Sequence, residues 1–449
     1  MLEKVYKILE ITNKSTQKIS SFFCDNEIFQ KSSVSFLLQI AGSLFGYTFL
    51  LLVTRNIGAS TWGVFVLFVS ILNISSIFAR LGVDMFTLKW VSASSTLLNK
   101  VKTIYFSSFR LVLFSSTVVS LLLYLTAESI AECILHNSSF VSIIKWIAYV
   151  LPLFAITSVN ENTFRGLKMI KEYAFFQRTA KMLFAVIFFV IFCYGFKITD
   201  TQSVIFSYIL GLVIIFFSST FFIFRIIKSS NFLKYINSKD MIRQSIPMMI
   251  SSSVLLLMSW VDSLMIGSFI GEHEVGVYNV AVKVALLTSF TLSAVNSIAA
   301  PKISRAFNNE KEVEFKNIVI QTTKTIFFST IPIVFVIFLF PEFILNFFGE
   351  EFLVAKTALL ILAFSQVLNA MSGSVGVILT MTGKEKVYQN ILLFALVINI
   401  ILNLLLIPEY GIEGAAIASA SSLIFWNLYS VYYVYIHYNI LTFISFRNE

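Results

Sequence analysis

Residues 57–65 read IGASTWGVF, and residues 270–278, which lie 213 positions later, read IGEHEVGVY. Each stretch has an Ile-Gly pair followed, at the same spacing, by a Gly-Val pair and an aromatic residue. The same offset relates further identical residues: Leu44 and Leu257, Leu51 and Leu264, Lys89 and Lys302, and the pairs Lys171-Glu172 and Lys384-Glu385. A constant offset over more than 100 residues indicates an internal duplication, so the chain is predicted to contain two copies of one structural unit.

The composition indicates which class of protein this duplication builds. The chain has 449 residues, of which 57% are hydrophobic and 13% are charged, and its mean hydropathy is +0.85. Soluble domains carry about 25% charged residues, because their surface must face water. The low share of charge excludes a soluble enzyme and a disordered chain, and it indicates a polytopic membrane protein.

Twelve segments are long and apolar enough to cross a membrane, which takes about 20 residues in a helix. They are rich in Phe and lack the alternating pattern of barrel strands. The predicted fold class is therefore an all-α membrane protein with about 12 transmembrane helices. The segments cover residues 33–54, 62–79, 103–125, 140–159, 181–196, 203–227, 244–268, 275–298, 318–340, 355–380, 389–407 and 412–436.

Lys and Arg residues are divided unequally between the two sides of the predicted membrane. If the N-terminus is inside, 27 of the 33 basic residues lie on the inner side, three lie on the outer side and three lie within the segments. Cytoplasmic loops of membrane proteins carry such an excess. The bias supports twelve crossings and predicts that both termini are cytoplasmic. It also accounts for the net charge of +9 without a nucleic-acid partner.

Each copy contains six segments, and an even number of crossings gives both copies the same orientation. The predicted architecture is therefore two parallel six-helix bundles related by an axis along the membrane normal. We expect a cytoplasmic amphipathic N-terminal arm at 1–32, an N-terminal six-helix lobe at 33–235 and a C-terminal six-helix lobe at 236–449. Two such lobes with a cleft between them are typical of transporters, which bind substrate near the midplane and rock to alternate access.

The repeated glycines have a predicted backbone role. In each copy the Ile-Gly pair is expected to end one helix and the Gly-Val pair to begin the next, across a six-residue turn on the outer side. Glycine readily adopts the positive φ that is common at helix ends.

Charged residues inside predicted helices are costly and by default mark function. Asp262 and Lys283 lie about 9 and 12 Å from the outer ends of two consecutive helices. They are therefore at a similar depth and are placed to pair with each other. Their counterparts in the first copy are Phe49 and Ser70, so the charges belong to one lobe. This asymmetry favours a functional role over the alternative, a buried ion pair that locks two helices.

Other polar residues within the helices have simpler explanations. Arg110 and Lys145 lie toward helix ends, from which their long side chains can snorkel to the interface. Asn399 and Asn403 are one helical turn apart and are expected to form hydrogen bonds between helices.

Basic residues at the helix ends provide candidate anion sites. Arg55 is the one Arg on the predicted outer face, where it is suited to bind a phosphate in a bidentate manner. Residues Arg80, Lys89 and Lys302 lie at inner helix ends, where a pyrophosphate group would be attracted. The positive-inside rule alone also explains these three residues. The chain has no recognisable catalytic or nucleotide-binding motif, and its three Cys and three His are scattered, so no cofactor or metal is expected.

Several stretches resemble one known family. The second copy contains SIP at 245–247, WVDSLMIG at 260–267, GVYNVA at 276–281 and APKIS at 300–304. Three further stretches fit the same pattern: GASTWGVF at 58–65, ALLILAFSQVLNAMSG at 358–373 and GIEGAAIA at 411–418. Together they resemble the polysaccharide repeat-unit (O-antigen) flippases of the multidrug/oligosaccharidyl-lipid/polysaccharide (MOP) exporter superfamily.

The resemblance implies a V-shaped pair of six-helix bundles with a cationic central cavity, lined by the first, second, seventh and eighth helices. Among the charged candidates, it therefore implies that Arg55, Asp262 and Lys283 lie on the cavity-lining helices and that Arg110 and Lys145 do not. The implied substrate is an undecaprenyl-pyrophosphate-linked oligosaccharide, moved from the inner to the outer leaflet of the bacterial plasma membrane. Substrate-binding roles are expected for Arg55, Lys283, Arg80, Lys89 and Lys302, and an ion-coupling role for Asp262 with a proton or sodium ion.

The implied partners are membrane lipids and a polysaccharide polymerase, and the chain is expected to be a transporter and not an enzyme. Two alternatives remain open. A cation-coupled multidrug exporter has the same fold, but it would favour an acidic cavity. A membrane polysaccharide polymerase or ligase would need catalytic groups on a large outer loop, and the predicted outer loops are short.

Overall fold

The computed structural model describes residues 27–228 and 231–443. The predicted amphipathic arm at 1–32 therefore lies outside the described residues up to position 26, and its last six residues belong to the first described helix. In the described ranges the regular structure consists of helices alone, which confirms the all-α fold class.

The first bundle, which we call the N-lobe, contains the helices of the first copy. These are α2 (Glu27–Asn56), α3 (Ala59–Arg80), α4 (Val83–Ala93), α5 (Leu98–Leu125), α6 (Ala127–Cys133), α7 (Phe140–Gly166), α8 (Ile170–Ala174), η1 (Phe175–Thr179), α9 (Ala180–Val190), η2 (Ile191–Gly195) and α10 (Thr201–Ile227). Helices α8 to η2 are continuous, and both η1 and η2 are π-helical.

The second bundle, the C-lobe, contains the helices of the second copy. These are α11 (Ser238–Phe269), α12 (Glu272–Ala285), η3 (Leu286–Thr288), α13 (Ser289–Asn308), α14 (Glu312–Leu339), α15 (Pro341–Asn346), η4 (Glu350–Ala355), α16 (Lys356–Ser372), α17 (Val375–Met381) and α18 (Glu385–Tyr438).

Eleven helices in the described residues are long and apolar enough to cross a membrane. The last of them, α18, has 54 residues and would be about 81 Å long if it were straight, far more than the roughly 30 Å of a bilayer core. Its backbone is non-helical at Gly411, with φ 58° and ψ −135°. This residue separates the predicted segments 389–407 and 412–436, so α18 supplies two crossings and the predicted number of twelve agrees with the structure.

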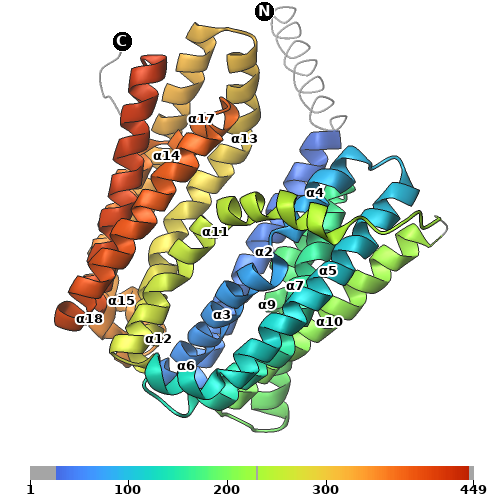
Figure 1. The fold of residues 1–449 in the computed structure, drawn as a ribbon. Helices are drawn as coiled ribbons and strands as arrows, with labels where there is room; N and C mark the ends of the chain where they lie inside the picture. Colours follow the sequence, from blue (N-terminus) through green and yellow to red (C-terminus); the bar gives the residue numbers. More distant parts are fainter. Residues whose placement is uncertain (1–26, 229–230, 444–449) are drawn as a thin grey trace, which may run out of the picture.

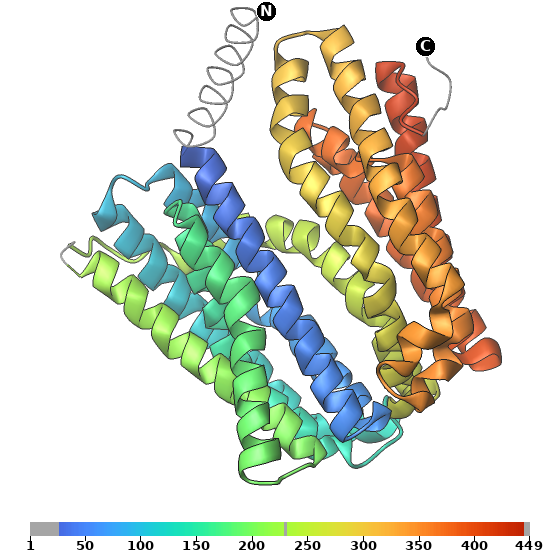
Figure 2. The ribbon, with the colours of Figure 1, turned by 180° about the vertical axis from the view of Figure 1, so that it is seen from behind.

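The two lobes meet at one end and diverge toward the other (Figures 1 and 2). The first residue of α2 and the last residue of α18 both lie at the end where the lobes diverge, which we call the open end. The turns between α2 and α3 and between α11 and α12 lie where the lobes meet, which we call the closed end. The loop charges predict that the open end faces the cytoplasm.

Both lobes share a hydrophobic core near the closed end. The largest cluster of buried apolar side chains fills the N-lobe, with Phe49, Phe65 and Phe68 near its centre, and continues into the C-lobe through Val277 and Val280 of α12. Apolar faces of α3 and α12 are thus buried against each other instead of against lipid. This contact holds the two bundles together.

The repeated glycines make that contact possible. Gly58 and Gly271 have φ values of 113° and 140°, which confirms the expected positive φ between the helices. The expected six-residue turn is wrong, because α3 begins directly after Gly58 and α12 directly after Gly271. Gly63 and Gly276 therefore lie inside the helices. A Cβ on Gly63 would lie 2.7 Å from the carbonyl carbon of Glu272, so the backbones of α3 and α12 touch here.

Helix α11 links the lobes at the open end. Its first part begins beside the N-lobe and runs across to the C-lobe (Figure 1). Pro247 lies inside this helix. The indole N–H of Trp90 in α4 donates to the side-chain oxygen of Gln244, at 3.2 Å. A Cβ on Gly82 would lie 2.8 Å from the backbone nitrogen of Met249. The beginning of α11 is therefore packed against the N-lobe, and its remainder belongs to the C-lobe.

Candidate functional site

A cavity of about 360 Å³ lies between the two lobes. Four helices contribute to its wall as the family resemblance implies, namely α2, α3, α11 and α12. Further lining residues come from η1 and α9 of the N-lobe and from η3 and α13 of the C-lobe. Its lining residues are Gln39, Gly42, Ser43, Gly46, Tyr47, Leu50, Trp62, Phe65, Val66, Val69, Arg178, Met182, Trp260, Asn279, Lys283, Leu286 and Phe290.

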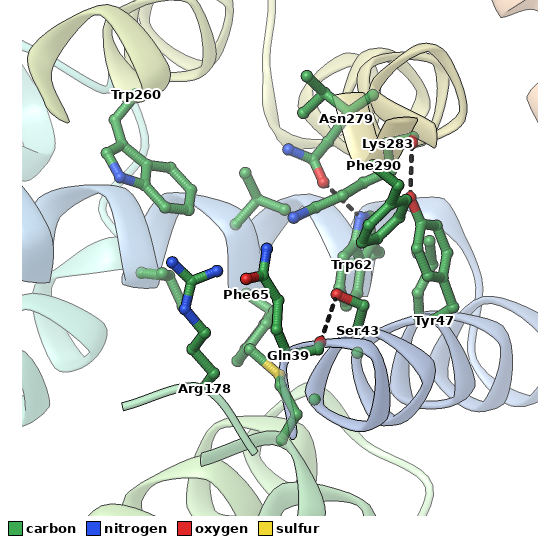
Figure 3. Close-up of a pocket in the computed structure, with 17 residues that line it drawn as sticks. Gln39, Ser43, Tyr47, Trp62, Phe65, Arg178, Trp260, Asn279, Lys283 and Phe290 are labelled. Carbon is green, nitrogen blue, oxygen red and sulfur yellow. Dashed lines mark hydrogen bonds between the residues drawn. The ribbon is translucent and has the colours of Figure 1, made fainter. Parts of the chain in front are cut away.

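Lys283 projects into this cavity from α12 (Figure 3). Its backbone carbonyl accepts a hydrogen bond from the hydroxyl of Tyr47 in α2, at 2.7 Å, so the helix segment that carries the lysine is held against the N-lobe. Within the described part of the chain, no carboxylate lies within ion-pair distance of the Lys283 ammonium. The ammonium is therefore available to an anionic ligand.

Arg178 projects into the same cavity from the N-lobe (Figure 3). It belongs to the π-helical segment η1, and such segments often occur at functional sites. Gln39 and Trp260 lie beside it in the view of the cavity. Arg178 was not predicted as a site residue, because it precedes the predicted segment 181–196 and was counted among the inner-loop charges. The helix begins at Ile170, and its polar first part lines the cavity.

The cavity is positively charged and partly aromatic. Among its 17 described lining residues there is no Asp or Glu, whereas Lys283 and Arg178 contribute one cation from each lobe. Trp62, Trp260 and Phe290 supply aromatic surface. Charges act more strongly near a protein interior than in bulk water. The arrangement is suited to an anion that carries groups able to stack on aromatic rings.

Asp262 lies outside this cavity, in a polar cluster buried within the C-lobe. The amide nitrogens of Asn399 and Asn403 in α18 donate to its Oδ1 at 3.1 and 2.7 Å. Its Oδ2 accepts from the hydroxyl of Tyr278 at 3.2 Å and from that of Ser419. The interhelical hydrogen bonds expected for Asn399 and Asn403 are thereby confirmed. A second cavity of about 250 Å³ adjoins this cluster.

Asp262 and Lys283 do not form the ion pair that their similar depth allowed. Tyr278, which contacts Asp262, and Lys283 are five residues apart on α12, so they project about 140° apart around the helix axis. Equal depth in the membrane thus does not bring the two charges together. Asn279 lines both the central cavity and the cavity beside Asp262. Its side-chain oxygen accepts from the indole N–H of Trp62, at 3.2 Å.

Arg55 lies at the closed end and does not line the central cavity. Its guanidinium donates to two backbone carbonyls of the C-lobe, those of Phe347 at 2.8 Å and Asn346 at 3.0 Å. In this conformation two of its nitrogens are thus engaged by the protein.

The three inner-rim residues are not brought together around the cavity. Arg80 forms an ion pair with Asp84 at 3.1 Å and donates to the hydroxyl of Ser158 at 2.9 Å, all within the N-lobe. Lys89 is exposed and lies over the ring of Trp90, 5.8 Å from its centroid. Lys302 is exposed in α13.

Arg110 and Lys145 behave as surface-directed residues. The Arg110 guanidinium stacks on Tyr235, 4.1 Å from the ring centroid. The Lys145 ammonium lies 3.8 Å from Glu128 and 5.5 Å from the ring centroid of Tyr124. Neither residue lines the central cavity.

A buried ion pair in the N-lobe was also missed. The Lys181 ammonium lies 2.7 Å from Glu161, and their side chains are 17% and 5% exposed. The predicted segments 140–159 and 181–196 placed Glu161 outside the membrane and Lys181 at its edge. Helix α7 in fact continues to Gly166, which draws Glu161 into the lobe.

Comparison with known proteins places this architecture in a family. A family model described as polysaccharide biosynthesis protein matches residues 28–307, more than half of the chain. The chain belongs to the polysaccharide biosynthesis protein family. A second model, described as MatE, matches residues 247–405. The family resemblance found in the sequence is thus confirmed.

The chain is 28% identical over 224 residues to the probable low-salt glycan biosynthesis flippase Agl15 of Haloferax volcanii. The match covers 50% of this chain and 47% of the relative, so the chain spans about half the length of that curated relative.

Two solved structures share its fold. An inward-facing multidrug resistance MATE family transporter of the MOP superfamily aligns with a TM-score of 0.69 at 14% identity, over 91% of this chain and 97% of that one. The lipid II flippase MurJ in its inward closed conformation aligns with a TM-score of 0.67 at 16% identity, over 90% and 87%. These likenesses confirm the MOP fold of two parallel six-helix bundles.

Proposed function

We propose that the protein is a flippase for lipid-linked glycans. The observation that carries the proposal is the interlobe cavity, in which Lys283 and Arg178 face an acid-free space from opposite lobes. A lipid-linked glycan has an anionic phosphate linkage, a sugar and a long apolar tail. The two cations would hold the phosphate groups, while the tail remains in the bilayer.

The arrangement of the lobes supports a proposed mechanism of alternating access. The cavity lies where the lobes diverge toward the open end, and the closed end is sealed by the contact of α3 with α12. An anion that contacts both Lys283 and Arg178 would draw the lobes together around it. The aromatic rings of Trp62 and Trp260 offer stacking surfaces for sugar rings. No step requires bond cleavage, so the proposed activity is transport and not catalysis.

The finer proposal concerns substrate and location. The expected substrate is an undecaprenyl-pyrophosphate-linked O-antigen or polysaccharide repeat unit, moved from the inner to the outer leaflet of a bacterial plasma membrane, with a polysaccharide polymerase as partner. The family match and the glycan flippase relative support the lipid-linked glycan class. A pyrophosphate carries more negative charge than a monophosphate, which suits a site with two cations.

Asp262 is the proposed site of ion coupling, with a proton or sodium ion as the coupling ion. The carboxylate is surrounded by neutral oxygen-bearing groups, and the side-chain oxygen of Asn403 is buried without a hydrogen-bond partner. Hard cations prefer such oxygen ligands. The shared wall residue Asn279 places this cluster next to the substrate cavity. An ion bound at Asp262 would change which conformation the C-lobe favours, and it would do so without contacting the substrate.

The other two candidate functions fit the structure less well. A multidrug exporter for cationic drugs would be opposed by the two cations of the cavity, despite the shared fold. A polymerase or ligase would need a catalytic outer domain, and the closed end of the described residues carries only short connections and the short helices α6, α15 and η4.

The proposal is tested in a polysaccharide-producing host that lacks its own copy of the gene. Wild-type protein should restore surface polymer, and the deletion strain should accumulate single lipid-linked repeat units on the cytoplasmic leaflet. Lys283→Ala and Arg178→Ala should each fail to restore export at normal expression. Lys145→Ala is the matched control, because that lysine is paired with Glu128 outside the cavity.

Full export by a well-expressed Lys283→Ala/Arg178→Ala double variant would contradict the assignment of the cavity. Normal polymer in the deletion strain, together with altered drug sensitivity, would favour the multidrug exporter. Repeat units trapped on the outer leaflet would favour the polymerase.

A further inference from the structure

Two side chains cross between the lobes at the closed end, and each ends on a helix terminus of the other lobe. The first is Arg55, in the last turn of α2. Its Nε and Nη2 donate to the carbonyl oxygens of Phe347 and Asn346, at 2.8 and 3.0 Å. Asn346 is the last residue of α15, and carbonyl groups at a helix C-terminus attract a cation.

The second crossing residue is Glu351 in η4 of the C-lobe. Its Oε1 accepts the backbone N–H of Ala59, the first residue of α3, at 2.7 Å. Helix α3 has no capping side chain of its own, because its N-cap residue is Gly58. A Cβ on Gly58 would lie 3.1 Å from the same Glu351 oxygen, so the missing side chain leaves room for the carboxylate. Glu351 therefore caps a helix of the other lobe, with the sign of charge that a helix N-terminus favours.

The second copy of the repeat does not use this arrangement. Gly271 is the N-cap of α12 and corresponds to Gly58, but the side chain nearest to it is Glu274 of the same helix. The cross-lobe capping is thus a property of one connection only. Helix α3 has no acidic residue in its first turn, whereas α12 has Glu272 and Glu274, so α3 takes its favourable charge from the other lobe.

The contacts of Arg55 and Glu351 with the opposite lobe must break at the same time, because they join the same two segments. Arg55 and Ala59 flank one turn of the N-lobe, whereas Asn346, Phe347 and Glu351 flank one connection of the C-lobe. Any movement that separates the closed ends must break both. We propose that Arg55 and Glu351 form a latch that holds the closed end shut and opens once in each cycle of lobe movement.

The environment of the latch fits a contact that is made and broken repeatedly. Arg55 is exposed and the Glu351 side chain is 39% exposed, so water can replace both hydrogen bonds when the lobes part. His273 lies 3.6 Å from the second oxygen of Glu351 and belongs to the same lobe, so it helps to orient the carboxylate without crossing the interface. Exposure also limits the strength of each contact, so each should shift the lobe equilibrium by about five-fold.

The experiment measures opening of the closed end directly and requires no substrate, so its outcome does not depend on the proposed flippase activity. The full chain carries nitroxide labels at Leu125→Cys and Glu409→Cys, two exposed positions on different lobes at the closed end. The native cysteines at 24, 133 and 193 are replaced by Ser. Pulsed electron–electron distance measurements in lipid nanodiscs then give the populations of closed and separated states.

Arg55→Ala and Glu351→Ala should each raise the ratio of separated to closed states by about five-fold, and the double variant should raise it further. Arg55→Lys keeps the charge but loses the paired hydrogen bonds of the guanidinium, and Glu351→Gln keeps a hydrogen-bond acceptor. Both variants should therefore show smaller shifts, and they replace an Ala variant that folds poorly. Lys356→Ala is the matched control, because it removes an ion pair with Glu342 that lies within the C-lobe at the same end. Distance distributions that are unchanged in both Ala variants, or changed equally in the control, would overturn the latch.

Discussion

The contact between α3 and α12 makes a quantitative prediction about two glycines. A Cβ on Gly63 would lie 2.7 Å from the carbonyl carbon of Glu272, and a Cβ on Gly276 would lie 2.9 Å from that of Ala59. Two carbon atoms prefer a separation of about 3.5 to 4.0 Å. Each Cβ would also overlap the oxygen of that carbonyl group, so each substitution by Ala forces the helices more than 1 Å apart. The obstacle is backbone, which cannot move aside as a flexible side chain can.

Overpacking of this kind typically costs about 1 to 3 kcal/mol. The cost applies only while the closed end is shut, because separated helices leave room for the methyl group. At about 2 kcal/mol, Gly63→Ala should raise the ratio of separated to closed states roughly 30-fold. Gly276→Ala should have a similar effect, and the double variant should be locked with its closed end apart.

The labels at positions 125 and 409 report this equilibrium as a change in the interlobe distance distribution. Gly46→Ala is the control, because its Cβ would meet only the side chain of Met182, at an ordinary 3.8 Å. If Gly63→Ala and Gly276→Ala give the same distances as Gly46→Ala, the added methyl groups do not separate the helices. The same result would show that this packing is not what seals the closed end.

Two further predictions concern ion pairs. Lys181→Met should lower the free energy of unfolding by about 3 kcal/mol, because Glu161 would remain buried without its partner. Denaturant titration should show that Lys181→Met/Glu161→Gln recovers most of this loss. A double variant as unstable as the single variant would contradict the prediction. At the closed end, a hydrogen bond from Lys356 and its charge hold the pKa of Glu342 below the usual 4.5, so this contact contributes stability above pH 4.5 and loses it as pH falls through the lowered value. Carboxyl NMR titration should show the Glu342 pKa rise toward 4.5 in Lys356→Ala, and an unchanged titration would contradict the assigned cause.

Much of the architecture follows from patterns that the bilayer imposes. Lipid-facing helices must be apolar over about 20 residues, so the twelve crossings could be predicted, including the two within α18. The 213-residue offset predicted the two bundles, and the cost of intramembrane charge singled out Asp262 and Lys283. Lys283 indeed lines the cavity between the lobes.

A hydropathy pattern identifies helices that face lipid, so it could not predict residues that face a polar part of the protein interior. Arg178 and Glu161 lie on helical extensions too polar for the apolar pattern, because these extensions face the cavity or a neighbouring helix and not lipid. Likewise, depth alone could not show that Asp262 faces Asn399 and Asn403 while Lys283 faces the other lobe. The direction around a helix axis depends on tertiary packing, which a single sequence does not reveal.

Transport of an anionic lipid-linked glycan through the cavity, as proposed here, can be measured directly. Purified protein is reconstituted into liposomes that contain a fluorescent undecaprenyl-pyrophosphate oligosaccharide, and its appearance at the outer leaflet is followed with an impermeant quencher. We expect the wild type and Lys145→Ala to increase the quenched fraction over protein-free liposomes, whereas Lys283→Ala/Arg178→Ala should not. Equal quenching with the wild type and the double cavity variant would contradict the proposed transport.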